Sequence, residues 1–312
     1  MTFTRRTFLR DSAQALGAAS LLGTLPDLAG AKNAPGRVSA SDITVKDVAG
    51  LALIAGAGCN VVALPGADGA LLIDGGLEVN SALLLKTVAS ATRTRRVHTL
   101  INTHWHPEQT GSNEAVGKAG GVIIAHEVSR LALTRAEQSP LFEGRYGPLP
   151  DKARPVKTTY NTGTLDWAGE PVEYRYLPAA HTNGDLYVHF PRRNVLVAGG
   201  PAGADHWPLI DYINGGFMHG FLRSYEILTE VVKPDTVIIP AYGRTLTGAE
   251  VAKQKDMYWE LFRMFFQSFN KGYGPQDIVA EHPLKNYEAQ YGDPAKFLEY
   301  AYHSTQLATI PH

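Results

Sequence analysis

The stretch Val97-His98-Thr99-Leu100-Ile101-Asn102-Thr103-His104-Trp105-His106-Pro107-Glu108-Gln109 decides how this chain folds. Its apolar first part is typical of a buried strand, and the strand ends where two histidines begin. Side chains two positions apart on an extended backbone point the same way, so His104 and His106 can reach one cation from a rigid strand edge. A His-x-His pair alone does not identify a metal site, and further ligands must come from elsewhere in the chain.

A third histidine lies in a second tight loop, Ala180-His181-Thr182-Asn183-Gly184-Asp185, which opens onto another apolar run. Three neutral imidazoles with one open position are typical of a catalytic zinc site, where the ion lowers the pKa of a bound water to about 7. The predicted metal ligands are therefore His104, His106 and His181. One zinc ion per chain is expected, and iron or manganese stays an alternative because the sequence does not choose between these metals.

Apolar runs and turn signals on both sides of the histidines predict alternating strands and helices. Expected strands cover residues 51–55, 59–64, 70–74, 97–102, 121–125, 172–177, 185–190, 194–198 and 236–239, and expected helices cover 79–91, 114–119, 127–135 and 221–232. A Gly- and Pro-rich insert at 137–155 is expected to be a loop. Strands followed by mixed strand and helix, twice over, indicate an α/β protein with two layered halves packed face to face.

Five motifs, in order, carry a resemblance to a known superfamily. They are Leu72-Ile73-Asp74-Gly75-Gly76, the histidine stretch from Thr103 to Gln109, Ala180 to Asp185, Val197-Ala198-Gly199 and Pro240-Ala241-Tyr242-Gly243. They resemble the metallo-β-lactamase superfamily, whose first metal motif reads T-H-x-H-x-D-H and whose later motif reads A-H-T-x-G-D. The resemblance spans roughly residues 43–247 and implies the four-layer αβ/βα sandwich of that superfamily.

The departures from this resemblance gather at the second of the superfamily's two metal positions. Glu108 and Gln109 stand where the family has Asp-His, Gly200 stands for the bridging aspartate, and Tyr242 stands for the last histidine ligand. A glutamine carbonyl and a neutral phenol bind zinc weakly, which leaves the carboxylate of Glu108 as the one further candidate ligand. A single metal ion is therefore expected.

Three residues are candidates for catalysis. Glu108 either deprotonates or orients a metal-bound water, or it only forms hydrogen bonds within its loop. Tyr242 either stabilises an oxyanion or is a structural tyrosine. His206 lies six residues beyond Gly200 and either supplies a ligand or a leaving-group acid, or packs in its loop. Asp74 is implied by the resemblance to support the metal loop through hydrogen bonds.

The composition limits the classes of partner. A formal net charge of −1 over 312 residues gives no attraction to nucleic acid or acidic membranes, so a small-molecule substrate is expected. The single cysteine, Cys59, excludes an intramolecular disulfide and a thiolate metal cluster, and its apolar surroundings predict a buried thiol.

Both ends of the chain carry separate segments. Arg5-Arg6 before Phe8, a short apolar stretch and Ala29-Gly30-Ala31 resemble a twin-arginine export signal with a cleavage site. The expected division is a signal peptide at 1–31, a metallo-β-lactamase-like domain at 32–247 and a helical extension at 248–312 packed on that domain. Such a chain would use the twin-arginine export machinery, be periplasmic or secreted, and keep no membrane segment after cleavage.

The leading functional prediction is a mononuclear metal-dependent hydrolase of an ester, lactone, amide or thioester, in which a metal-bound hydroxide attacks a carbonyl. The competing prediction is a non-catalytic binding or accessory protein, motivated by the replaced second metal position. Oxygen or sulfur chemistry at iron is a third alternative that fits three histidines and a carboxylate. Hydrolysis of β-lactams does not follow from the fold.

Overall fold

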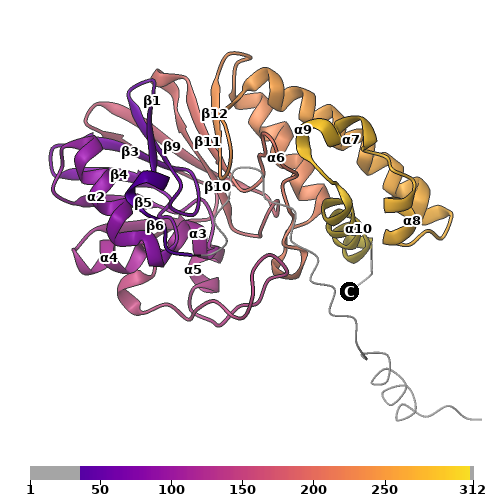
Figure 1. Ribbon diagram of the computed structural model, residues 1–312, viewed down its shortest axis with the longest axis horizontal. Coiled ribbons are helices and arrows are strands. Elements are labelled where there is room, and N and C mark those ends of the chain that lie inside the picture. The colour runs from indigo at the N-terminus through magenta and orange to yellow at the C-terminus, as the bar shows by residue number, and fades with distance from the viewer. Residues whose placement is uncertain (1–35, 310–312) are drawn as a thin grey trace, which may run out of the picture.

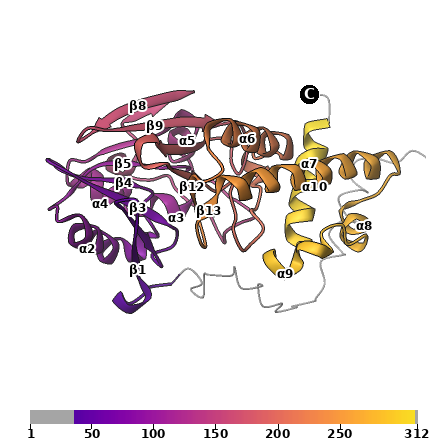
Figure 2. The same ribbon diagram turned by 90° about the horizontal axis from the view of Figure 1, so that it is seen from above.

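The computed structural model describes residues 36–309, and within them two mixed sheets pack face to face with helices on the outside (Figure 1). The expected signal peptide at 1–31 lies outside the described residues. In Figure 2 the strands β4 and β5 lie between the helix α2 on one side and the strands β8 and β9 on the other. The α/β fold class and its four-layer sandwich are thereby confirmed. No helix in the described range is long and apolar enough to cross a membrane.

The first sheet has seven strands that follow one another in sequence order. They are β1 (Thr44–Val48), β2 (Leu51–Ala55), β3 (Val61–Gly66), β4 (Gly69–Ile73), β5 (Val97–Ile101), β6 (Val122–His126) and β7 (Lys157–Thr159). The strands up to β4 pair antiparallel, and β4 to β7 pair parallel. The parallel strands are joined by helices, as parallel pairing requires; these are α2 (Ser81–Thr92), α3 (Pro107–Thr110), α4 (Asn113–Lys118) and α5 (Glu127–Ala132).

The second sheet has six strands in the order β13-β12-β11-β10-β9-β8. They are β8 (Thr162–Trp167), β9 (Glu170–Leu177), β10 (Asp185–Phe190), β11 (Val195–Gly199), β12 (Val237–Pro240) and β13 (Leu246–Thr247). Only β11 and β12 pair parallel, and the helix α6 (Met218–Val231) lies between them in the chain. All other pairs in this sheet are antiparallel.

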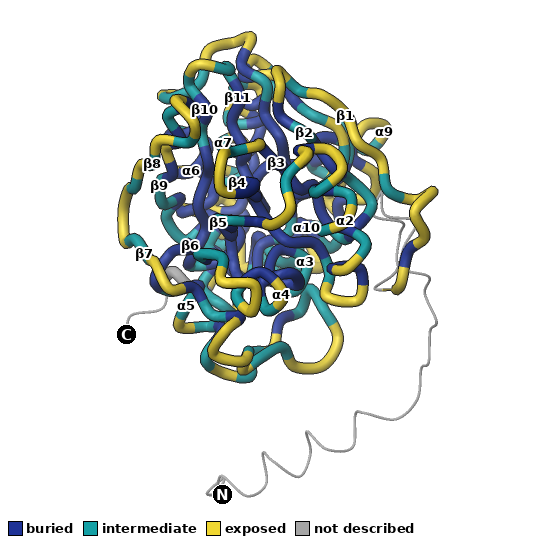
Figure 3. The backbone as a smooth tube through the Cα atoms, turned by 90° about the vertical axis from the view of Figure 1, so that its left-hand side faces the viewer, coloured by how far each residue is buried: buried dark blue, intermediate teal, exposed yellow. Residues whose placement is uncertain are grey.

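Three apolar clusters separate the layers. Along β10 the side chains of Leu186, Val188 and Phe190 enter the cluster between the two sheets, whereas Tyr187 points into the cluster against α6. This alternation is the period of two expected for a strand covered on both faces. Figure 3 accordingly shows the central strands of both sheets buried along their length, with exposed residues in the connections.

Four helices follow β13 in the described part of the chain: α7 (Gly248–Asn270), α8 (Pro275–Ala280), α9 (Glu288–Tyr291) and α10 (Ala295–Thr309). Of these, α7 and α10 pack against α6, and α8 packs against α10. Thr247 and Glu250 cap α7 reciprocally, which fixes its start. The apolar side of α7, including Tyr258, Leu261 and Phe265, joins α6 in one buried cluster. These helices therefore share a core with the second sheet.

Candidate metal centre

The three predicted histidine ligands meet at the ends of two buried strands. His104 and His106 lie between β5 and α3, and His181 lies in the loop before β10. One nitrogen of each imidazole lies within 4.8 Å of the others, and all three residues are buried. Two loops 75 residues apart are thus brought to one point, because both strands are fixed in facing sheets.

The inward nitrogens are Nε2 of His104, Nδ1 of His106 and Nε2 of His181. Nδ1 of His106 lies 3.0 Å from Nε2 of His181. Nε2 of His104 is buried and has no hydrogen-bond partner within the described structure. A buried ring nitrogen without a partner is costly unless a ligand satisfies it. The arrangement therefore has the donor set and the orphaned atom of a metal site.

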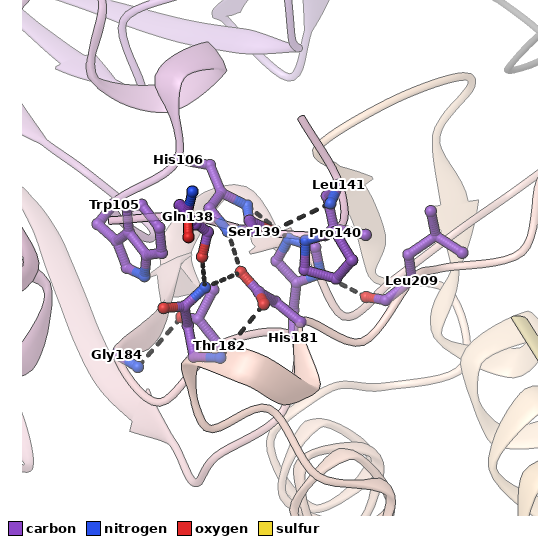
Figure 4. Close-up of polar contacts among 12 residues, drawn as sticks. Trp105, His106, Gln138, Ser139, Pro140, Leu141, His181, Thr182, Gly184 and Leu209 are labelled. Carbon is purple, nitrogen blue, oxygen red and sulfur yellow. Dashed lines mark hydrogen bonds and ion pairs between the residues drawn. The ribbon is translucent and has the colours of Figure 1, made fainter. Parts of the chain in front are cut away.

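The opposite nitrogen of each imidazole has a hydrogen-bond partner. Nδ1 of His104 lies 3.1 Å from Oγ1 of Thr103, and Nε2 of His106 lies 3.0 Å from a carboxylate oxygen of Asp211. Nδ1 of His181 contacts the main-chain carbonyl of Leu209 (Figure 4). Metal-binding histidines are typically oriented in this way by an acceptor on the far ring nitrogen. The residues present thus fit a metal ion held by three imidazoles.

Asp74 supports this loop from beneath. Its two carboxylate oxygens accept hydrogen bonds from the main-chain N–H of Thr103 at 2.7 Å and from its hydroxyl at 2.8 Å. Burial raises the pKa of Asp74 to about 7, and the two hydrogen bonds from Thr103 oppose that rise. Asp74 reaches His104 only through the hydroxyl of Thr103, so it orients a ligand and is not one itself.

Burial sets the charge of the histidines. It holds the pKa of His104 well below its ordinary value, and the neighbouring His181 and His106 lower it further. Burial first, and then His106, lower the pKa of His181 to about 3. Burial alone would raise the pKa of Asp211, but the hydrogen bond from His106 holds it below its ordinary value. His104 and His181 are therefore neutral at physiological pH, which is the state that binds metal.

Glu108 lies in α3, half-buried, beside the histidines in sequence. Its main-chain carbonyl accepts a hydrogen bond from the thiol of Cys59 at 2.9 Å. Within residues 36–309 the one cluster of potential ligand atoms consists of the three histidines, without Glu108. Cys59 is buried, as its apolar surroundings predicted.

Tyr242 and His206 lie side by side, with ring centroids 6.0 Å apart. Burial raises the pKa of the Tyr242 phenol well above its ordinary value, and the charge of Glu108 adds to the rise. Burial lowers the pKa of His206, while its neighbour Asp205 forms an ion pair with Arg244 at 3.0 Å. Both side chains stay neutral near pH 7, and within the described residues His206 is not part of the histidine cluster.

Gly200 and Gln109 are two of the residues at which the chain departs from the superfamily motifs. A Cβ atom at Gly200 would lie 2.3 Å from Cδ2 of His181, so no side chain fits there while the imidazole keeps its place. The amide of Gln109 is fully buried beside the side chains of Cys59 and Tyr242.

Two features of the site were not found from sequence. Asp211 is separated from His106 by 105 residues and stands in no spaced motif, so its pairing depends on the tertiary fold. The expected loop at 137–155 lies beside the histidines. The ring centroid of Phe142 lies 6.0 Å from that of Trp105 and 5.8 Å from that of His106. Figure 4 shows Gln138 to Leu141 next to His106 and His181. An acidic residue in a Pro-flanked loop was the only available signal for Asp211.

Solved structures with this fold include enzymes of two kinds. A metallo-beta-lactamase from Pontibacter korlensis has a TM-score of 0.53 and 18% identity, and covers 70% of this chain and 93% of its own. The DIM-1 metallo-beta-lactamase has a TM-score of 0.57 and 15% identity, and covers 70% of this chain and 98% of its own. The sec-alkylsulfatase Pisa1 from Pseudomonas sp. has a TM-score of 0.64 and 18% identity, and covers 84% of this chain but 50% of its own. At these identities the likeness shows the fold alone.

Sequence comparison gives the family. No curated protein matches the chain. The family model of the metallo-beta-lactamase superfamily matches residues 55–243, which is more than half of the chain and contains all three clustered histidines. The chain therefore belongs to the metallo-beta-lactamase superfamily.

Proposed function

We propose that this protein is a hydrolase that uses one metal ion, zinc or alternatively iron or manganese, held by His104, His106 and His181. The observation that supports this proposal most directly is the pairing of each outer ring nitrogen with an acceptor while the inner nitrogens converge. An ion bound by three imidazoles supplies Lewis acidity and an activated water near neutral pH. Membership of a superfamily that contains hydrolases agrees with this proposal.

The proposed substrates are compounds with an activated carbonyl: esters, lactones, amides or thioesters. Glu108 follows His106 by two residues and would accept or deliver the proton exchanged during attack. The neutral phenol of Tyr242 would donate a hydrogen bond to the developing oxyanion. His206, beside Tyr242, is neutral near pH 7, so it would first receive the proton taken from the attacking water and then pass it to the leaving group.

The number of metal ions follows from the residues at the second position. Gly200 has no room for a bridging carboxylate next to His181, and the amide of Gln109 is a weak ligand. We therefore propose one ion per chain. The same replacements favour the alternative function, binding without catalysis.

One experiment separates these alternatives. Purified protein is loaded with zinc, iron or manganese, its metal content is measured, and esters, lactones, thioesters and β-lactams are offered before and after metal removal. The proposal expects about one ion per chain and hydrolysis that is lost in His181→Ala but kept in His189→Ala, whose residue lies in β10 outside the cluster. Hydrolysis by metal-free protein would contradict the proposal. A bound ion without any hydrolysis would favour the binding protein.

The location of the protein is a further proposal from its N-terminal sequence. Arg5-Arg6 and the small residues at 29–31 support export by the twin-arginine route to the periplasm or beyond. Replacing both arginines by lysine should leave the unprocessed chain in the cytoplasm. N-terminal sequencing of the exported protein should find a start near Lys32.

A further inference from the structure

The segment between β11 and α6, residues 200–217 and here named the acceptor loop, supplies the acceptors for two of the three imidazoles. The carbonyl of Leu209 contacts Nδ1 of His181, and the carboxylate of Asp211 contacts Nε2 of His106. The main-chain N–H of Asp211 also donates to the carbonyl of His181 at 2.8 Å. The orientation of both rings therefore depends on where this loop lies.

The acceptor loop has little regular structure of its own. Its only regular element is a single 3-10 turn at Tyr212–Asn214. A segment without a ladder of main-chain hydrogen bonds takes its shape from the groups packed against it. Near Asp211 those groups are the segment 179–183 and the carbonyl of Gln138, and along the first half of the loop they are the helices after residue 248.

Gln254 of α7 makes the most central of these contacts. Its Nε2 donates to the carbonyl of Gly203 at 2.7 Å, and the Gln254 residue is 3% exposed. The hydroxyl of Tyr225 donates to its Oε1 at 3.1 Å, and the hydroxyl of Tyr291 lies 3.0 Å from its Nε2. A buried amide whose donor and acceptor are both used is held in one position. Gln254 thus fixes the first part of the acceptor loop to α6, α7 and α9.

Other contacts hold the rest of the loop to the same helices. Nε1 of Trp207 donates to the carbonyl of Gly292 after α9 at 2.8 Å. The indole ring stacks on Phe297 of α10, with the ring centroids 5.2 Å apart. Just beyond the loop, the N–H of Met218, the first residue of α6, donates to Oγ of Ser304 in α10 at 3.0 Å. The loop is therefore tied to the C-terminal helices at its start and its middle, and the helix that follows it is tied to α10.

We infer that the C-terminal helices are a working part of the metal centre and that Gln254 is a positioning residue for it. By fixing the acceptor loop, these helices hold the carbonyl of Leu209 and the carboxylate of Asp211 where they aim His181 and His106 at the ion. This inference rests on the proposed function only in that a metal is the ligand at which the rings aim. Gln254 acts through the loop and touches neither the metal nor the substrate.

The test compares two buried substitutions in the C-terminal helices. Gln254→Met keeps the approximate shape of the side chain and removes its hydrogen bonds to the loop. Ile278→Ala is the matched control, because Ile278 of α8 is fully buried in the same cluster and lies outside the acceptor loop. Zinc affinity is measured by competition with a chelator on the full-length protein, and the unfolding midpoint is measured for both variants.

The expected result is a loss of zinc affinity of about 5- to 10-fold in Gln254→Met, at or below the low end of the roughly 10- to 100-fold range for removal of a ligand's own outer partner, because Gln254 acts on those partners through the loop. Ile278→Ala should keep its affinity within about twofold even if it unfolds more easily. The cobalt-loaded Gln254→Met protein should show altered d–d absorption, since ring orientation changes the ligand field. Equal affinities in the two variants, or an unchanged cobalt spectrum, would overturn the inference.

Two further measurements keep the test decisive. If Gln254→Met does not fold, Trp207→Phe takes its place. This variant keeps an aromatic ring next to Phe297 but removes the hydrogen bond to Gly292, and its zinc affinity should also fall below that of Ile278→Ala. If the wild-type protein binds no metal, the proposed function fails. Amide hydrogen exchange of the metal-free proteins still decides the inference: the N–H of Asp211 should exchange faster in Gln254→Met than in Ile278→Ala, and equal rates would refute it.

Discussion

The histidine loop, residues 102–110, and the acceptor loop, residues 200–217, meet at His106 but are held in place by different means. The histidine loop is fixed by neighbours in its own sheet: Thr103 bonds to Asp74 at the end of β4, and the carbonyl of Gln109 accepts from Gly75 and Asn102. The acceptor loop is fixed in part by Gln254 and Gly292, much later in the chain, and in part by the segments that contain Ala179 and Gln138. His104 and His106 are thus placed by local contacts, whereas the group that aims His106 is not.

The largest effect is expected where the acceptor loop touches the ring of His181. In Gly200→Ala the new Cβ would lie 2.3 Å from Cδ2 and 3.0 Å from Nε2 of His181, so the ring must leave its place. Zinc affinity should fall by more than the roughly 10- to 100-fold typical of losing an outer partner, because a ligand itself is displaced. Chelator competition measures it. Gly274→Ala, whose Cβ would meet nothing closer than 3.7 Å, should bind zinc normally.

The next effect tests the acceptor loop alone. Asp211→Ala removes the carboxylate that accepts from His106, and zinc affinity should fall about 10- to 100-fold. Asp205→Ala removes a loop carboxylate that pairs with Arg244 at the surface, and it should change the affinity little. A similar loss in both variants would mean that the charge of the loop matters and the contact with His106 does not.

A smaller effect is expected from the histidine loop. Thr103→Val keeps the shape of the side chain but removes the hydroxyl between Asp74 and Nδ1 of His104. The main-chain N–H of residue 103 still donates to Asp74, so the loop stays in place. Zinc affinity should fall by about 10-fold, the lower end of the range for outer partners. A loss larger than that of Asp211→Ala would reverse the comparison between the loops.

The smallest effect is a pH dependence of the metal-free protein. The pKa of His181 is about 3 in the folded chain and near 6.5 when unfolded, so the unfolded chain binds the proton first as the pH falls. The folded state therefore loses stability between pH 6.5 and pH 3 and keeps it above pH 6.5. Urea unfolding at pH 7 and pH 5 measures the loss, which should shrink in His181→Ala. An unchanged loss in that variant would show that other groups cause it.

The buried strands and helices of the fold were predictable from the sequence. Strands such as 97–101 and 185–190 are apolar because both of their faces are covered, and their positions were predicted from the sequence. No strand was predicted for β1, β7, β8 and β13, which are the outermost strands of the two sheets. The residues of β1 are almost all exposed, and those of β8 alternate between exposed and half-buried. An edge strand is stabilised by pairing along one side and needs no apolar run, so its sequence resembles that of a loop.

The metal centre likewise contains some residues that a local sequence pattern identifies and others that it does not. By itself the sequence determined the superfamily and the three histidines that cluster, because motif chemistry and short spacing are properties of a few neighbouring residues. Only the tertiary structure decided that Asp211 and the carbonyl of Leu209 orient His106 and His181, and that Gly200 leaves room for the ring of His181. The physical reason is that these contacts join segments whose positions are set by the packing of two sheets and the C-terminal helices, and no local pattern records that packing.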